Sequence, residues 1–193
     1  MDKNVALLLA PGFEEAEAIV TLDILSRLGV HVVTLACQST REVTSYHNLK
    51  VLADDLLENN RERLFDAVII PGGPDGSKNL AANEAVIAFI RRHDQEGRLI
   101  CPICSAAARV LAPQGLLKGR HFVSSGTSYQ DVTDGRYVDA PVVKDGNLVS
   151  GQDLGAVFDF AFAIAYLLTG EGDNVREQAE HISHTLKVDL TTL

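Results

Sequence analysis

Short apolar runs alternate along the chain with amphipathic stretches. Runs rich in apolar and β-branched residues predict buried strands, at residues 4–10, 30–36, 65–73, 98–104 and 121–125. Apolar residues at three- and four-residue spacing predict helices, at residues 13–29, 83–97, 105–115, 153–170 and 172–186. Residues 41–54 resemble a small hairpin or an edge strand, and residues 137–151 resemble two strands joined by a turn. Because the main strands are apolar throughout, we expect a mostly parallel sheet covered by helices on both faces.

The composition narrows the class of protein. The chain has 193 residues, of which 46% are hydrophobic and 22% are charged, as expected for one globular domain over residues 1–193. Its net charge of −9 and the lack of a Lys/Arg block argue against nucleic acid as a partner. No apolar run reaches the roughly 18 residues that span a bilayer, and the N-terminus lacks signal-peptide flanks. Three cysteines, an odd number, indicate free thiols, so we expect a cytoplasmic protein.

Two of these cysteines stand three residues apart in the stretch LICPICSAAARVLA, residues 99–112. Strand rise separates Cys101 and Cys104 by roughly 10 Å, beyond the approximately 7 Å that a disulfide allows between Cα atoms. Cys104 ends the expected strand and precedes the expected helix, whose N-terminus stabilises a thiolate. We therefore predict that Cys104 is an elbow nucleophile with a lowered pKa, and that Cys101 and Cys37 are structural. The alternative, that Cys101 and Cys104 are both buried apolar residues, stays open.

Other candidate groups follow neighbouring strands, whose carboxyl ends meet at the ligand-binding edge of a parallel sheet. A helical wheel places Glu17 near the core-facing side of its helix, which is costly unless the carboxyl is protonated or hydrogen-bonded. The helix dipole alone accounts for Glu14 and Glu15 at the helix start, but less well for Glu17. Gly72 and Gly73, in the stretch PGGPDGSKN, can aim backbone N–H groups at a ligand and form a candidate oxyanion site.

These stretches together resemble the ThiJ/PfpI superfamily, most closely its Parkinsonism-associated deglycase and ThiJ-like branch. The resemblance covers nearly the whole chain and is carried by APGFEEAEAIVTLDILSRLG, DAVIIPGGPDGSKNL, ICSAAARVLA and GQDLGAVFDFAFAIAYLLTG. It implies a flavodoxin-like three-layer α/β sandwich, similar to class I glutamine amidotransferases, and a homodimer. It also implies that Cys104 is the elbow cysteine, that protonated Glu17 hydrogen-bonds the sulfur, and that Gly72 and Gly73 form the oxyanion site.

The sequence departs from the family pattern near the site. Many members carry a histidine after the strand that here reads FVSSGT, where this chain has Ser125. His121 lies earlier, at the expected strand start, and we do not assign it as the base. Ser125, His121 and Glu14 are retained as accessory candidates. Ser105 is a candidate substrate contact, and its place after the cysteine, where the protease branch has histidine, argues against a Cys-His protease.

Two family arginines of the anion-binding and dimer-contact region are also missing. His47 stands where the first is common, and Gly-Gln-Asp-Leu-Gly at residues 151–155 replaces the Ser-Arg-Gly-Pro-Gly that contains the second. No P-loop or complete GxGxxG motif is present, so we expect no nucleotide cofactor. The pair formed by His181 and His184 has helical spacing but no third ligand nearby, so we expect no metal.

The resemblance implies a cysteine-dependent, stress-response enzyme that acts on small reactive carbonyls or glycated adducts through Cys104. Two alternatives stay open. The same thiol can serve an oxidation sensor or chaperone through its sulfinate. A C–N hydrolase of the amidase or protease type is the other alternative, but it needs a base that the sequence does not clearly supply.

Overall fold

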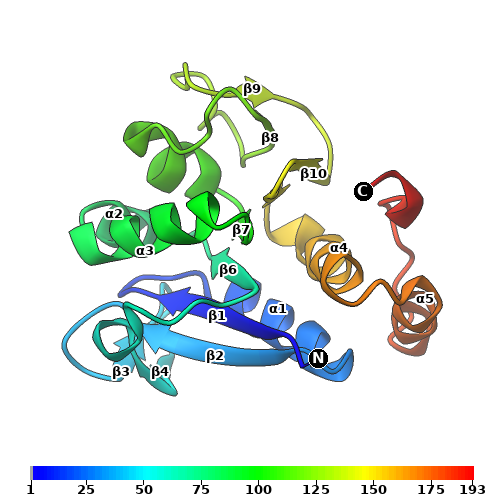
Figure 1. Cartoon of the computed structure of the whole chain (residues 1–193), viewed down its shortest axis with the longest axis horizontal. Coiled ribbons are helices and arrows are strands. Elements are labelled where there is room, and N and C mark those ends of the chain that lie inside the picture. Colours follow the sequence, from blue (N-terminus) through cyan, green and yellow to red (C-terminus); the bar gives the residue numbers. More distant parts are fainter. Residues whose placement is uncertain (1) are drawn as a thin grey trace.

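The computed structural model describes residues 2–193 and has a central sheet between two layers of helices (Figure 1). The sheet consists of β1 (Asn4–Leu9), β2 (His31–Ala36), β5 (Asp55–Leu56), β6 (Ala67–Ile70), β7 (Leu99–Pro102), β10 (Val142–Asp145) and β11 (Leu148–Gly151). These seven strands run in the order β10-β11-β7-β6-β1-β2-β5. Every neighbouring pair is parallel except β10 with β11. The structure therefore confirms the mostly parallel sheet.

Two small sheets stand apart from the central one. The hairpin of β3 (Glu42–Thr44) and β4 (Lys50–Leu52) is antiparallel, as the sequence predicts. The pair of β8 (His121–Phe122) and β9 (Arg136–Tyr137) is parallel.

The helices form two layers, one on each face of the sheet. They are α1 (Glu15–Arg27), α2 (Pro74–Ala81), α3 (Glu84–Gln95), α4 (Val157–Thr169) and α5 (Gly172–His181). Short helical turns cover Leu57–Asn60, Ala107–Leu111, Ala112–Gln114, Leu154–Ala156 and Leu190–Thr192, of which Ala107–Leu111 is π-helical and the others are 3-10. Figure 1 shows α2 and α3 on one side of β6 and β7, and α4 with α5 on the other.

Two hydrophobic clusters fill the space between the sheet and these layers. Leu7 and Leu9 belong to the cluster that packs against α1 and α4, whereas Leu8 belongs to the cluster that packs against α3 and the π-helical turn. Successive strand residues therefore face opposite, equally buried sides. This arrangement explains why the strands are apolar throughout. Among residues 2–193, no helix is long and apolar enough to cross a membrane.

Several elements differ from the sequence predictions. The sequence pattern does not predict the helix α2, because its stretch PDGSKNLA is short and mostly polar, with Leu80 its one large buried side chain. The expected helix over 105–115 is broken into a π-helical and a 3-10 turn, and Pro113, which lacks an N–H group, lies in the second. The final helix ends at His181 rather than residue 186, and Ser183 follows with a φ of 58°.

Candidate functional site

Cys104 lies just beyond β7 in a strained turn. Its φ of 61° falls in the left-handed region that residues other than glycine rarely enter. Backbone hydrogen bonds of 3.0 Å hold the turn on both sides: the Cys104 N–H donates to the Gly151 carbonyl, and the Ser125 N–H donates to the Cys104 carbonyl. The ends of β7 and β11 and the chain after β8 therefore position the thiol together.

Glu17 places a buried carboxyl beside this thiol. It lies in the first turn of α1 and is 1% exposed. The Gly72 N–H donates to Glu17 Oε2 at 2.8 Å, and the carboxyl also shares a hydrogen bond with the Cys104 thiol. A Cβ at position 72 would lie 2.9 Å from that oxygen and 2.8 Å from the Cys104 Cβ. Only glycine therefore lets the three groups approach one another.

The buried setting changes the acidity of both groups. Burial raises the pKa of Glu17 from its ordinary 4.5 to about 7, although the Gly72 hydrogen bond opposes the rise. Burial and then the negative charge of Glu17 raise the pKa of the Cys104 thiol to about 12, against hydrogen bonds from the Ser125 hydroxyl and the Ser105 N–H. The prediction of a lowered Cys104 pKa is therefore wrong. Loss of hydration and the neighbouring carboxylate outweigh the favourable effect of the helix start.

A pocket of about 190 Å³ opens beside the thiol. It is lined by Glu14, Glu17, Gly73, Pro74, Cys104, Ser105, Arg109 and Ser125. The structure thus brings together most of the candidates that follow separate strands. The sequence reasoning missed Arg109, although a lone charge in the apolar stretch AARVL was a signal that this residue faces away from the core.

The two glycines differ in whether their backbone N–H groups are available to a ligand. The Gly72 N–H, which we expected to face an oxyanion, instead donates its hydrogen bond to the Glu17 carboxyl. Gly73 has a φ of 96°, precedes the first turn of α2 and lines the pocket. Its N–H has no hydrogen-bond partner among residues 2–193. Gly73 therefore offers an available amide, whereas Gly72 orients the acid.

The histidine candidates lie outside the pocket. His121 Nδ1 pairs with Asp145 Oδ2 at 2.9 Å, next to the β10–β11 turn. Ser125 stands at the thiol instead, where its hydroxyl hydrogen-bonds the sulfur. His47 pairs with Glu15 across 2.8 Å near the start of α1. In the described part of the chain, no histidine lines the Cys104 pocket.

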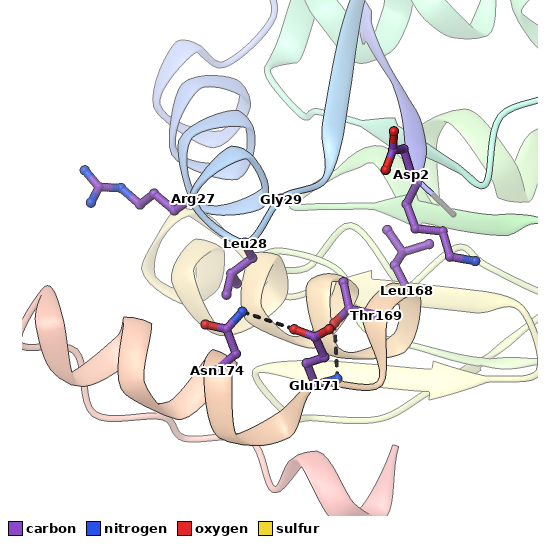
Figure 2. A pocket seen from close by; sticks show the side chains of 9 residues that line it. Asp2, Arg27, Leu28, Gly29, Leu168, Thr169, Glu171 and Asn174 are labelled. Carbon is purple, nitrogen blue, oxygen red and sulfur yellow. Dashed lines mark hydrogen bonds between the residues drawn. The ribbon is translucent and has the colours of Figure 1, made fainter.

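A larger hollow, of about 590 Å³, lies between the ends of α1 and α4 (Figure 2). Asn174 there donates a hydrogen bond to Glu171 at 3.3 Å. Asp2 and Lys3, which precede β1, line it together with Leu28 and Leu168. It lies at the amino ends of the strands and has no cysteine among its lining residues, so the smaller pocket remains the candidate for chemistry.

Comparison with known proteins agrees with this fold. The model of the DJ-1/PfpI family matches residues 3–167. The chain is 35% identical to Protein dj-1beta of Drosophila melanogaster over 182 residues, which cover 93% of this chain and 96% of that protein. It is 34% identical to the Glutathione-independent glyoxalase DJR-1.2 of Caenorhabditis elegans over 172 residues, covering 87% of this chain and 90% of that protein.

Some relatives are longer, and solved structures are also similar. The chain is 31% identical to Protein DJ-1 homolog B of Arabidopsis thaliana over 156 residues, 81% of this chain, but spans only 36% of that protein's length. A crystal structure of a cysteine-to-alanine mutant of the DJ-1 superfamily protein STM1931 from Salmonella typhimurium superposes with a TM-score of 0.94. It is 62% identical and covers 95% of this chain and 99% of its own.

Proposed function

The chain belongs to the DJ-1/PfpI family, whose fold is flavodoxin-like and glutamine amidotransferase-like, and we propose that it is a cysteine-dependent stress-response enzyme. Its substrates are small reactive carbonyls or the glycated adducts that they form. The observation that carries this proposal is the hydrogen-bonded pair of Cys104 and Glu17 beside a pocket of about 190 Å³. Similarity to a C. elegans protein named as a glyoxalase supports the substrate class.

The first chemical step is addition of the Cys104 sulfur to an aldehyde carbon. The thiol proton passes to Glu17, whose pKa of about 7 lets it both hold and release a proton near neutral pH. The C–S bond forms, the carbonyl π electrons move to oxygen, and that oxygen takes the proton from Glu17. A neutral hemithioacetal results. The Gly73 N–H stabilises the developing oxyanion, and the Ser125 hydroxyl orients the sulfur.

We expect slow turnover. With no histidine at the pocket in the described structure, Glu17 handles each proton transfer. The high thiol pKa also keeps the fraction of thiolate small unless Glu17 is protonated.

Removal of the thiol tests this proposal. We expect Cys104→Ala to abolish the consumption of methylglyoxal. The measurement is the decrease in dicarbonyl concentration over time. Cys37→Ala is the matched control, because Cys37 is buried outside the pocket and should leave the rate within about twofold. Full activity in Cys104→Ala contradicts the proposal.

One observation favours oxidation sensing as a second candidate function. The Glu17 carboxyl, the Ser105 N–H and the Ser125 hydroxyl surround the Cys104 sulfur as hydrogen-bond partners, and such donors can hold sulfinate oxygens. A C–N hydrolase has less support, because a histidine base is lacking among the described lining residues.

Mild peroxide treatment tests the sensor. We expect a gain of two oxygen atoms on Cys104 by intact mass and peptide mapping, while buried Cys101 stays unmodified. Oxidation that is spread equally over the three cysteines, or is absent at Cys104, contradicts it.

We further propose a cytoplasmic homodimer in which residues 1–193 form one ThiJ/PfpI-type domain. Free thiols suit a reducing compartment. Exposed apolar side chains on α1 and the β3–β4 hairpin, including Ile19 and Leu52, suit a partner surface.

A further inference from the structure

Arg109 presents an unpaired cation at the Cys104 pocket. It lines the pocket, but its guanidinium makes no hydrogen bond or ion pair with residues 2–193. Elsewhere, Arg98 binds Asp66 at 3.2 Å and Arg120 binds Asp94 at 3.0 Å. Addition of the sulfur to an aldehyde does not use Arg109. Its charge therefore has no assigned role in either the fold or the reaction.

The backbone holds Arg109 at the pocket rim. Its N–H donates to the Ser105 carbonyl at 2.9 Å, so the residue follows the cysteine by about one helical turn. The π-helical turn over Ala107–Leu111 buries the alanines beside it and leaves Arg109 exposed. Single π-helical turns are frequent at functional sites, because they change which side chains face a ligand.

The charges around the pocket are arranged with acids on one wall and a base on another. Glu14 and Glu17 come from the start of α1, whereas Arg109 comes from the helical turn after Cys104. Glu14 does not form an ion pair with Arg109 and instead accepts the Ala16 N–H at 3.4 Å. A negatively charged group on a ligand is repelled from the α1 wall and attracted to Arg109.

We propose that Arg109 binds the carboxylate of a substrate that carries a negative charge next to its reactive aldehyde. This inference rests on the proposed function and specifies its substrate class: 2-oxo-acid-type aldehydes rather than neutral dicarbonyls alone. A guanidinium matches a carboxylate with two parallel hydrogen bonds. At about 30 Å³ per water-sized atom group, the pocket of about 190 Å³ has room for a molecule as small as glyoxylate.

The probe undergoes the same balanced addition as other aldehydes. The Cys104 sulfur bonds to the aldehyde carbon of glyoxylate, and the oxygen takes the proton from Glu17. The carboxylate is unchanged and lies against Arg109. The adduct blocks alkylation of the sulfur, so binding can be measured without turnover.

The experiment measures protection of Cys104 from iodoacetamide by glyoxylate or by neutral glyoxal, read by peptide mass spectrometry. We expect Arg109→Gln to raise the half-protecting concentration of glyoxylate about 10- to 100-fold and to leave that of glyoxal unchanged. Arg109→Lys should recover part of the loss. Arg91→Gln, on an exposed position of α3 away from the pocket, should behave as the wild type.

Three results overturn the inference: no protection of the wild type by glyoxylate, no change in Arg109→Gln, or an equal change for both aldehydes. Methylglyoxal turnover by the wild type tests the proposed function separately. Arg109-dependent protection without any turnover supports the anion site and contradicts the enzyme. Turnover with Arg109-independent protection supports the enzyme and contradicts the anion site.

Discussion

Cys104 and Glu17 compete for one proton, because they are buried together and share a hydrogen bond. The charge of Glu17 raises the Cys104 pKa, whereas the hydrogen bond with the Cys104 thiol lowers the Glu17 pKa, so the protons leave in two steps that belong to the pair. Between about pH 7 and the high pKa of the thiol, the pair therefore carries a single negative charge. Protonation of Glu17 is the condition for a thiolate at Cys104, and the reactivity of the sulfur should depend on pH through the acid.

Replacing Glu17 tests the raised pKa through stability. Between pH 4.5 and about 7 the folded chain holds the Glu17 proton and the unfolded chain does not, so stability falls as the pH rises. For this group the loss approaches about 3 kcal/mol above pH 7. We expect Glu17→Gln, which stays neutral, to melt near the wild-type temperature at pH 4.5 and at a higher temperature at pH 8.

Thermal unfolding followed by circular dichroism at the two pH values measures this difference. Glu177→Gln, at an exposed position of α5, controls for the loss of a carboxylate as such. If the melting temperatures of Glu17→Gln and the wild type differ by the same amount at both pH values, the result contradicts a raised Glu17 pKa.

At the scale of elements, Asp94 joins three segments near the end of α3. Its side chain is 4% exposed and binds Arg120 and Asn147 at 3.0 Å each, as well as Lys118. Lys118 and Arg120 precede β8, and Asn147 lies in the β10–β11 turn. Burial tends to raise the Asp94 pKa, but the hydrogen bonds from Lys118 and Asn147 and the charge of Arg120 prevail and lower it. The carboxylate thus anchors the segment that leads to Ser125.

We expect Asp94→Ala to reduce the free energy of unfolding by about 1–3 kcal/mol at pH 7, because it removes the carboxylate that pairs with half-buried Arg120 and accepts a hydrogen bond from Asn147. The Asp94 carboxylate stabilises the folded chain at pH values above its pKa in the unfolded state. This stabilisation is lost as the pH falls through the lowered pKa of the folded state. The difference in free energy of unfolding between Asp94→Ala and the wild type, measured by urea unfolding, should therefore be smaller at low pH. Asp131→Ala, at an exposed loop position, should have little effect at either pH.

Elements with strong apolar patterns could be predicted, and those fixed by tertiary contacts could not. The strand β1 follows from its continuous apolar run, and the helix α3 follows from its helical periodicity. In contrast, β8 ends after two residues because the next N–H, that of Val123, donates to the Ser150 hydroxyl at 3.0 Å instead of to a strand. The position of α2 depends on close packing of Gly76 against Gly12 and Phe13, which no local pattern encodes.

The candidate site could likewise be predicted only in part. Because ligands bind where parallel strands end, the order of strands and helices along the chain is enough to place Cys104, Glu17 and Gly73 together. It does not give the depth of burial, which raises the Cys104 pKa. It also does not give the irregular turn that brings Arg109 to the pocket, because the π-helical backbone of Ala107–Leu111 departs from the regular α-helical period.

At the scale of the whole molecule, apolar side chains are exposed on α1 and the β3–β4 hairpin, and we expect two copies of the chain to meet there. Ile19 on α1 is 43% exposed, and Leu49 and Leu52 at the hairpin are 48% and 68% exposed. The Tyr46 N–H donates to the Phe13 carbonyl at 2.9 Å, which holds the hairpin against the segment that leads into α1. Burial of such side chains between copies is favourable.

We expect Leu52→Glu to shift the protein from dimer to monomer, measured by size-exclusion chromatography with light scattering. Leu64→Glu is a suitable control, because Leu64 is 38% exposed but precedes β6 rather than lying on α1 or the hairpin. A wild type that is monomeric at all concentrations, or a dimer that both variants leave intact, contradicts this surface.

The left-handed backbone at Cys104 has an evolutionary consequence. An L-residue in that conformation is less stable than glycine by about 1 kcal/mol or more, so the chain sacrifices folding stability to keep a thiol there. A lineage that no longer needed the sulfur would gain by mutating this codon to glycine or asparagine. Persistence of cysteine at position 104 among orthologues would thus be a sign of continuing selection for chemistry rather than for architecture.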